Sequence, residues 1–231
     1  MAAHEEGCLA TDLKAGWFAG LAQTAVGQPF DRVKVSIQAA SCGSSLGTLK
    51  HIIRTEGPIS LYRGSLAPAL IGGFAVSLQF ALWEQASLNG HSAFASGAFS
   101  GALSSPLICA IERVKIGQQL GKPQVLKGLF RGLPLVLARD SLGMAFYYSA
   151  FSQLEPVIGS LGAGGVAGCA YWLAVYLIDG WKTRVQADLG VSYSRAFGRP
   201  SFGGLGACLV RAVPVNAATF FVYRFFKTGK E

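Results

Sequence analysis

The feature that most constrains this chain is a pattern of glycine, acid, lysine and glutamine that occurs three times in one register. Each copy has two glycines four residues apart, an acid 11 residues after the second glycine, a lysine three residues later and a glutamine four residues after that. One acid and lysine at this spacing is ordinary helix chemistry, but three copies in register indicate an internal repeat. The copies are Gly16, Gly20, Asp31, Lys34 and Gln38; Gly97, Gly101, Glu112, Lys115 and Gln119; and Gly164, Gly168, Asp179, Lys182 and Gln186.

A second recurrence alternates with the first. The triplets at 62–64, 130–132 and 202–204 each end in glycine after an aromatic residue, and Glu84, Ser152 and Arg224 follow the last glycine of each by 20 residues. Each repeat therefore predicts two helices. We predict three repeats at residues 1–90, 91–159 and 160–231, of which the second and third are shortened.

The hydropathy of the chain indicates a membrane protein. Of its 231 residues 51% are hydrophobic and only 14% are charged, and the stretches 64–83, 92–111 and 160–178 contain no charged residue. About 20 apolar residues suffice for a helix to cross a bilayer. Weaker segments at 15–30, 133–154 and 209–226 complete a set of six. The predicted fold is an all-α membrane protein with six transmembrane helices in three pseudo-threefold pairs, with both termini on one side.

Several function classes fit poorly. A formal net charge of +8 in so apolar a chain does not indicate a nucleic-acid partner. His4, His51 and His91 are scattered outside the apolar segments, and no nucleophile stands at a catalytic spacing from them. The five cysteines show no paired or metal-ligand spacing. We therefore expect neither an enzyme nor a metal site.

Two motifs make the chain resemble a known family. The residues P-x-[DE]-x-x-K at 29–34 and E-G-x-x-x-x-Y-R-G at 56–64 resemble the mitochondrial carrier family, and the resemblance covers nearly the whole chain. Arg139-Asp140 and the segment RAVPVNAATF at 211–220 are similar to the carnitine, ornithine and related amino-acid carriers. The resemblance implies a multi-pass monomer of the mitochondrial inner membrane, with six tilted helices around a central cavity. It also implies one substrate site, alternating access, and cardiolipin bound at helix starts without any other cofactor.

The chain departs from the family pattern in its connections. The proline of the first motif is kept only as Pro29, where the other repeats have Ala110 and Leu177. The acid and the glycine that closes the triplet are 33 residues apart in repeat one, 20 in repeat two and 25 in repeat three. Repeat one has room for a short helix at 46–55, whereas repeat two does not. Either the chain is a reduced carrier, or the gene model that gives this sequence has lost coding sequence.

The repeated acids and lysines predict a gate on the matrix side. An ion at the membrane midplane costs about 2.5–3.5 kcal/mol on insertion scales, so it needs water or a partner. If the three odd-numbered helices converge, each acid can pair with the lysine of a neighbouring repeat. This predicts a ring of Asp31, Glu112 and Asp179 with Lys34, Lys115 and Lys182, braced by Gln38, Gln119 and Gln186.

The corresponding gate on the cytosolic side is incomplete in the sequence. Only one cyclic pairing avoids a contact between two acids, and it joins Glu84 to Lys227 and Arg224 to Glu155. Its third member is the neutral pair of Ser152 and Ser87. The alternative is that this gate has decayed and the carrier leaks.

The substrate site follows from the same register. Ile71, Arg139 and Arg211 lie 13 residues before Glu84, Ser152 and Arg224, so they face one another if the repeats are related by a threefold axis. Two guanidinium groups suit a carboxylate, Asp140 suits an amine, and Ile71 leaves room for an uncharged portion. This predicts a small zwitterionic or carboxylate solute. The alternative is that Arg139 and Asp140 only neutralise each other.

We therefore predict a carrier that moves a small amino-acid-like or carnitine-like solute by alternating access. One alternative is a carrier-like protein without transport activity that acts as a regulatory or interaction subunit. Another is a uniporter or leak pathway for protons or small anions.

Overall fold

The structure, a computed structural model, describes residues 2–40, 44–121, 128–187, 192–197, 202 and 204–228. The side chains of 2–16, and of residues 40, 161, 216, 217, 219–221, 223, 224 and 226–228 within helices, lie outside this description. The described part is helical and contains no strand. Its elements are α1 (Ala2–Ala40), α2 (Ser45–Glu56), the 3-10 helix η1 (Pro58–Tyr62), α3 (Leu66–Leu88), α4 (Ala93–Gln119), α5 (Leu133–Ala187), α6 (Tyr193–Ala196) and α7 (Leu205–Thr228).

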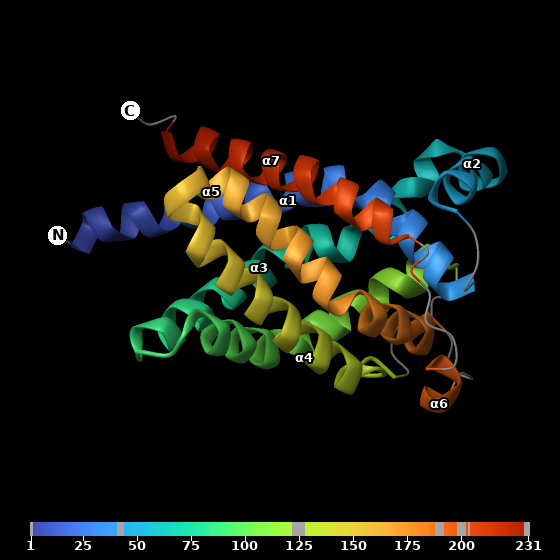
Figure 1. Cartoon of the computed structure of the whole chain (residues 1–231). Helices are drawn as coiled ribbons and strands as arrows, with labels where there is room; N and C mark the ends of the chain where they lie inside the picture. Colours follow the sequence, from blue (N-terminus) through green and yellow to red (C-terminus); the bar gives the residue numbers. More distant parts are fainter. Residues whose placement is uncertain are drawn as a thin grey trace.

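Helix α5 consists of two crossing helices joined by a sharp turn. Gly159 has non-helical backbone angles with a φ of 72°, a conformation that costs little only for glycine. The first arm, 133–158, and the second arm, 160–187, run in opposite directions (Figure 1). With α1, α3, α4 and α7 they make the six long helices that the sequence predicts, and α1 begins and α7 ends at the same end of the molecule (Figure 1).

Small residues allow the helices to approach closely. A side chain at Gly97 or Gly101 would overlap the backbone of Met144 or Asp140 on the first arm of α5. A Cβ atom at Gly20 would lie 3.2 Å from Cα of Gly73 on α3. These glycines are packing positions, as expected for small residues four apart in membrane helices.

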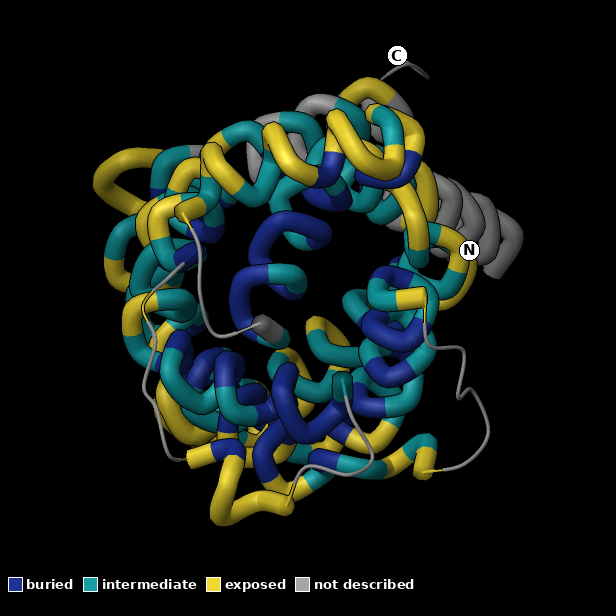
Figure 2. Tube along the Cα trace, turned by 90° about the vertical axis from the view of Figure 1, so that its right-hand side faces the viewer, coloured by how far each residue is buried: buried dark blue, intermediate teal, exposed yellow. Residues whose placement is uncertain are grey.

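Many large apolar side chains are exposed on the molecule, while several charged side chains are buried inside it. Seen from the end that bears α2 and α6, the helices form a ring whose buried residues face inward (Figure 2). Large apolar residues such as Leu70, Phe74 and Leu173 are exposed, whereas Lys34, Arg139 and Asp179 are buried. In the described part three helical stretches are long and apolar enough to cross a membrane, namely Pro58–Leu88, Ala93–Gln119 and Gly162–Ala187.

The connections differ among the repeats, as their lengths predict. In repeat one, helix α2 occupies the predicted position, because the Ser44 side chain caps its start and Ile52 packs against Val33, Ile37 and Leu61. In repeat three the described residues between α5 and α7 contain the short helix α6, whose Ala196 packs with Leu135 and Val185. The described residues between α4 and α5 form turns rather than a helix.

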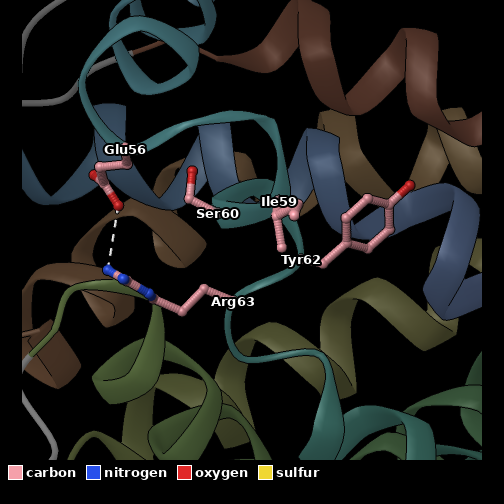
Figure 3. Close-up of a pocket in the computed structure, with 5 residues that line it drawn as sticks. All are labelled: Glu56, Ile59, Ser60, Tyr62 and Arg63. Atoms are coloured by element: carbon pink, nitrogen blue, oxygen red, sulfur yellow. Dashed lines mark hydrogen bonds and ion pairs between the residues drawn. The ribbon is translucent and has the colours of Figure 1, made fainter.

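A surface hollow of about 400 Å³ lies where α2 meets η1. Its lining includes Glu56 and Arg63, whose side chains are 3.2 Å apart (Figure 3). Both carboxylate oxygens of Glu56 also accept hydrogen bonds from Arg32 on α1, each of 3.0 Å. At this hollow, Glu56 at the end of α2 therefore binds two arginines, of which Arg32 connects α2 to α1.

Candidate substrate site and ion-pair ring

The three repeated acids and lysines meet in the structure. Nζ of Lys34 is 2.5 Å from Asp179, Nζ of Lys115 is 2.5 Å from Asp31, and Nζ of Lys182 is 3.0 Å from Glu112. Each lysine thus pairs with an acid of another repeat, and the pairs close a cycle through α1, α4 and the second arm of α5. We call these six residues the ion-pair ring.

Because charges of the ion-pair ring are buried, they need opposite charges and hydrogen bonds within the protein in place of water. Asp179 is 0% exposed, and its carboxylate contacts Lys182 and Arg139 at 3.2 and 3.1 Å in addition to Lys34. Lys34 also lies over the indole of Trp172, 4.1 Å from its centroid. A buried charge is tolerated when an opposite charge and hydrogen bonds replace water, and these contacts supply both.

The two arginines predicted for the substrate site lie in contact with the ion-pair ring. Nη1 of Arg139 is 2.6 Å from Glu112, and Nε of Arg211 is 3.0 Å from Asp31. Arg211 lies over Gly27, where an added Cβ atom would be 2.9 Å from its guanidinium. The sequence predicted a substrate site and a gate as separate sets, and the structure joins them. Ile71 on α3 is 42% exposed and does not contribute to the ionic contacts.

Asp140 is held by Arg139 and by a tyrosine that the sequence analysis did not single out. Nε and Nη2 of Arg139 donate to Oδ1 of Asp140 over 2.8 and 2.5 Å. The hydroxyl of Tyr171 donates to the same oxygen over 3.2 Å. The alternative of a mutually neutralised pair is therefore present geometrically, although Arg139 reaches Glu112 and Asp179 as well.

The charges of this region can be counted. We call the ion-pair ring, together with Arg139, Asp140 and Arg211, the central cluster. Its nine residues are five cations and four carboxylates, and seven of the eight carboxylate oxygens lie within 3.2 Å of a cationic nitrogen. The remaining oxygen, Oδ2 of Asp140, is buried and has no hydrogen-bond partner among the described residues.

The predicted glutamine brace requires a correction. Gln38 donates to Oδ2 of Asp179 over 2.9 Å, as predicted. Gln186 instead donates to the thiol sulfur of Cys109 over 3.6 Å, and the amide of Gln119 has no partner in the described part of the chain. Both side chains pack against a glycine of positive φ that precedes a helix. Gln119 packs against Gly64, which precedes α3, and Gln186 packs against Gly132, which precedes the first arm of α5. This packing draws them away from the ion-pair ring.

The residues predicted for the cytosolic gate are not joined within the described residues. Glu84 and Glu155 are exposed and form no ion pair with any described residue. Glu155 accepts a hydrogen bond from Ser160 over 3.0 Å, and Ser152 donates to the carbonyl of Ser149 over 3.2 Å. The side chains of Arg224 and Lys227 lie outside the described residues, so their pairing stays a prediction.

Comparison with known proteins extends the similarity to whole chains. The family profile described as mitochondrial carrier protein matches residues 6–89. The glutamate/glycine mitochondrial carrier ymc1 of Schizosaccharomyces pombe is 32% identical over 92% of this chain and 92% of its own length. The mitochondrial basic amino acids transporter of Homo sapiens is 30% identical over 92% of this chain and 88% of its own. The mitochondrial glycine transporter YMC1 of Saccharomyces cerevisiae is 28% identical over 95% and 91%.

These relatives are transporters of similar organisation rather than enzymes. The alignment with the Schizosaccharomyces pombe carrier spans 275 positions, more than the 231 residues of this chain, so that relative has stretches that this chain lacks. This agrees with the short connections of repeats two and three. Similarity at this level over nearly the whole of both chains, in a helical protein with apolar spans, indicates a multi-pass protein of the mitochondrial inner membrane, and the chain belongs to the mitochondrial carrier family.

Proposed function

We propose that this carrier moves a small α-amino acid across the mitochondrial inner membrane by alternating access. The observation that supports this proposal most directly is the contact of Arg139 and Arg211 with acids of the ion-pair ring. A solute carboxylate that binds these two guanidinium groups competes with Glu112 and Asp31 for the same donors. Binding of the solute and loosening of the ring are then one event.

The closed ring defines the starting state of this cycle. The ion-pair ring joins α1, α4 and the second arm of α5 toward the end that bears α2 and α6. The last turns of α3 and of the first arm of α5, which carry the exposed Glu84 and Glu155, lie at the opposite end (Figure 1). In the carrier family this corresponds to a matrix side that is closed and a cytosolic side that is open. Partly hydrated pairs such as Lys115 with Asp31 are weak enough to part, so the energy of solute binding can open them.

Amino acids are the solutes that the comparisons favour. Relatives that cover nearly the whole chain are named for glutamate, glycine and basic amino acids. A carboxylate on Arg139 and Arg211 and an ammonium on Asp140 are the contacts that such a solute needs. Carnitine has the same two charges, so it belongs in any panel of solutes.

The test is exchange in reconstituted liposomes. Vesicles that contain the purified protein and an unlabelled solute are given labelled glycine, glutamate, arginine or carnitine. We expect saturable uptake of at least one amino acid that requires a solute inside, and its abolition by Arg139→Ala. Arg195→Ala is the matched control, because Arg195 lies exposed on α6 and outside the central cluster.

The same experiment separates the alternatives. A folded wild-type protein that takes up no solute of the panel would favour a carrier-like regulatory or interaction protein. Ionic current without exchange would favour a uniporter or leak pathway. Uptake that persists in Arg139→Ala would contradict the proposed site.

A further inference from the structure

One oxygen of the central cluster lacks the partner that all the others have. Asp140 is 2% exposed, and its Oδ2 atom is buried without a hydrogen bond to any described residue. A buried acceptor without a hydrogen bond is destabilising, because folding has removed its water without replacing it. The other seven carboxylate oxygens of the central cluster lie within 3.2 Å of a cationic nitrogen. Oε2 of Glu112 also has no hydrogen-bond partner among the described residues, but it is 3.0 Å from Nζ of Lys182. Oδ2 of Asp140 has neither contact, so it is the acceptor that remains for a solute.

Tyr171 determines which oxygen of Asp140 is left. Its hydroxyl donates to Oδ1 over 3.2 Å, on the side where Arg139 already donates twice. The tyrosine ring lies directly over Gly143, where any side chain would overlap its edge. The absence of a side chain at Gly143 is thus what allows Tyr171 to reach Asp140.

The repeat pattern shows that this arrangement is not part of the common scaffold. Tyr171 lies three residues after Gly168, and the equivalent positions of the other repeats are Gln23 and Ser104. Gly143 lies four residues after Arg139, and its equivalents are Ala75 and Val215. The tyrosine and glycine therefore meet at one of three equivalent helix contacts, which is the asymmetry that recognition of an asymmetric solute requires.

We propose that Tyr171 is a positioning residue that makes the central cluster select solutes bearing N–H groups. With Oδ1 of Asp140 occupied by Arg139 and Tyr171, the carboxylate cannot rotate, and Oδ2 accepts a hydrogen bond from the ammonium of an amino acid. A trimethylammonium group has no N–H, so it is attracted to this carboxylate by charge alone and forms no hydrogen bond with Oδ2. This inference rests on the proposed function and specifies how the same site distinguishes amino acids from quaternary amines.

The test uses three competitors of labelled glycine uptake in the reconstituted full-length carrier. They are unlabelled glycine, acetate, in which a hydrogen atom replaces the amino group, and N,N,N-trimethylglycine. In wild type we expect glycine to compete best. In Tyr171→Phe its inhibition constant rises roughly three- to tenfold, as loss of one such hydrogen bond predicts, while the constants for acetate and trimethylglycine and the maximal rate stay the same.

Two further variants keep the result interpretable. Gly143→Ala retains the tyrosine hydroxyl but displaces the ring. It should therefore raise the inhibition constant of glycine alone, as Tyr171→Phe does. Tyr148→Phe is the control, because the hydroxyl of Tyr148 has no partner among the described residues and its loss removes no such contact. We expect the three competitors to have the same inhibition constants in Tyr148→Phe as in wild type.

The outcomes divide cleanly. A selective loss for glycine in both Tyr171→Phe and Gly143→Ala supports the inference. An equal loss for glycine and acetate in Tyr171→Phe, or no loss at all, overturns it and leaves the proposed function intact. If no amino acid competes in wild-type vesicles, it is the proposed function that fails, and this is seen before any substitution is made.

Discussion

Among the carboxylates of the central cluster, Asp179 has the most partners. Lys34, Lys182 and Arg139 lie within 3.2 Å of it, and Gln38 donates to it over 2.9 Å. Asp31, by contrast, has two cationic partners and a side chain that is 15% exposed. The two acids occupy equivalent positions in the repeat but differ in how much of their solvation the protein has replaced.

This difference predicts unequal effects of neutralising the two acids. Asp179→Asn leaves three cations around a neutral buried group, and removal of one partner from a buried ion pair costs about 3–5 kcal/mol. Asp31→Asn leaves Lys115 and Arg211, which are partly exposed and can hydrate. We expect thermal unfolding in detergent to show a much larger fall of Tm for Asp179→Asn. Equal falls would contradict the assigned burial.

For single residues, the sequence predicted that the repeated acids and lysines meet, but not which further residues contact the same acids. The shared register of the repeats placed the three acids and three lysines on facing sides of their helices, because the spacing of residues along a helix fixes the direction in which each side chain points. It did not reveal that Arg139 and Arg211 reach the same acids, since register gives no distance between helices. Tyr171 was missed for the same reason: its contact with Asp140 depends on the absence of a side chain at Gly143, on a different helix arm.

At the scale of elements, the short connection of repeat two changes what an arginine does. Arg32 and Arg113 each follow the acid of their repeat. Arg32 is bound to Glu56 at the end of α2, whereas Arg113 on α4 donates to the carbonyl of Gln186, near the end of α5. Arg131 donates to the neighbouring carbonyl of Val185 over 3.0 Å. Cations near a helix C-terminus are favourable, so these arginines join repeat two to repeat three.

Hydrogen exchange can separate the two roles. In Arg113→Ala we expect amides at 182–187 to exchange about tenfold faster, which corresponds to a charge-assisted hydrogen bond of about 1.4 kcal/mol, while α2 is unaffected. In Arg32→Ala the faster exchange should appear in α2 and not at the end of α5. Loss of protection in both regions in either variant would mean that the arginines do not act locally.

The helices themselves were largely predictable, and the reason lies in particular residues. Helix α2 was expected at 46–55 and spans Ser45–Glu56, because its apolar positions form one face and the Ser44 side chain caps its start. The join within α5 follows from Gly159 after Pro156. The glutamines after each lysine were assigned wrongly in two of three repeats, since their packing against Gly64 and Gly132 depends on the glycine corners of a neighbouring repeat.

At the scale of the whole molecule, the balance of charge bears on the solute. The central cluster contains five cations and four carboxylates, and seven carboxylate oxygens are already engaged. The third position equivalent to Arg139 and Arg211 is the apolar Ile71. A solute with one carboxylate and one ammonium finds a partner for each, whereas the second cationic group of a basic amino acid finds no further acid on α3 at Ile71. We therefore expect glycine to be exchanged in preference to arginine, although relatives of both kinds are similar to this chain.

The same balance predicts how the preference can be changed. Ile71→Glu brings the number of carboxylates to five and places the new one where the threefold register directs it toward Arg139 and Arg211. The ratio of arginine to glycine uptake in liposomes should rise about tenfold or more, because close charge pairs couple by about 1.5 kcal/mol or more. Ile71→Gln is the matched control, since it has nearly the same shape without the charge and should leave the ratio unchanged. If Ile71→Glu folds and exchanges glycine with an unchanged ratio, position 71 does not face the solute, and the selectivity of this carrier depends on the other two helices of the threefold set.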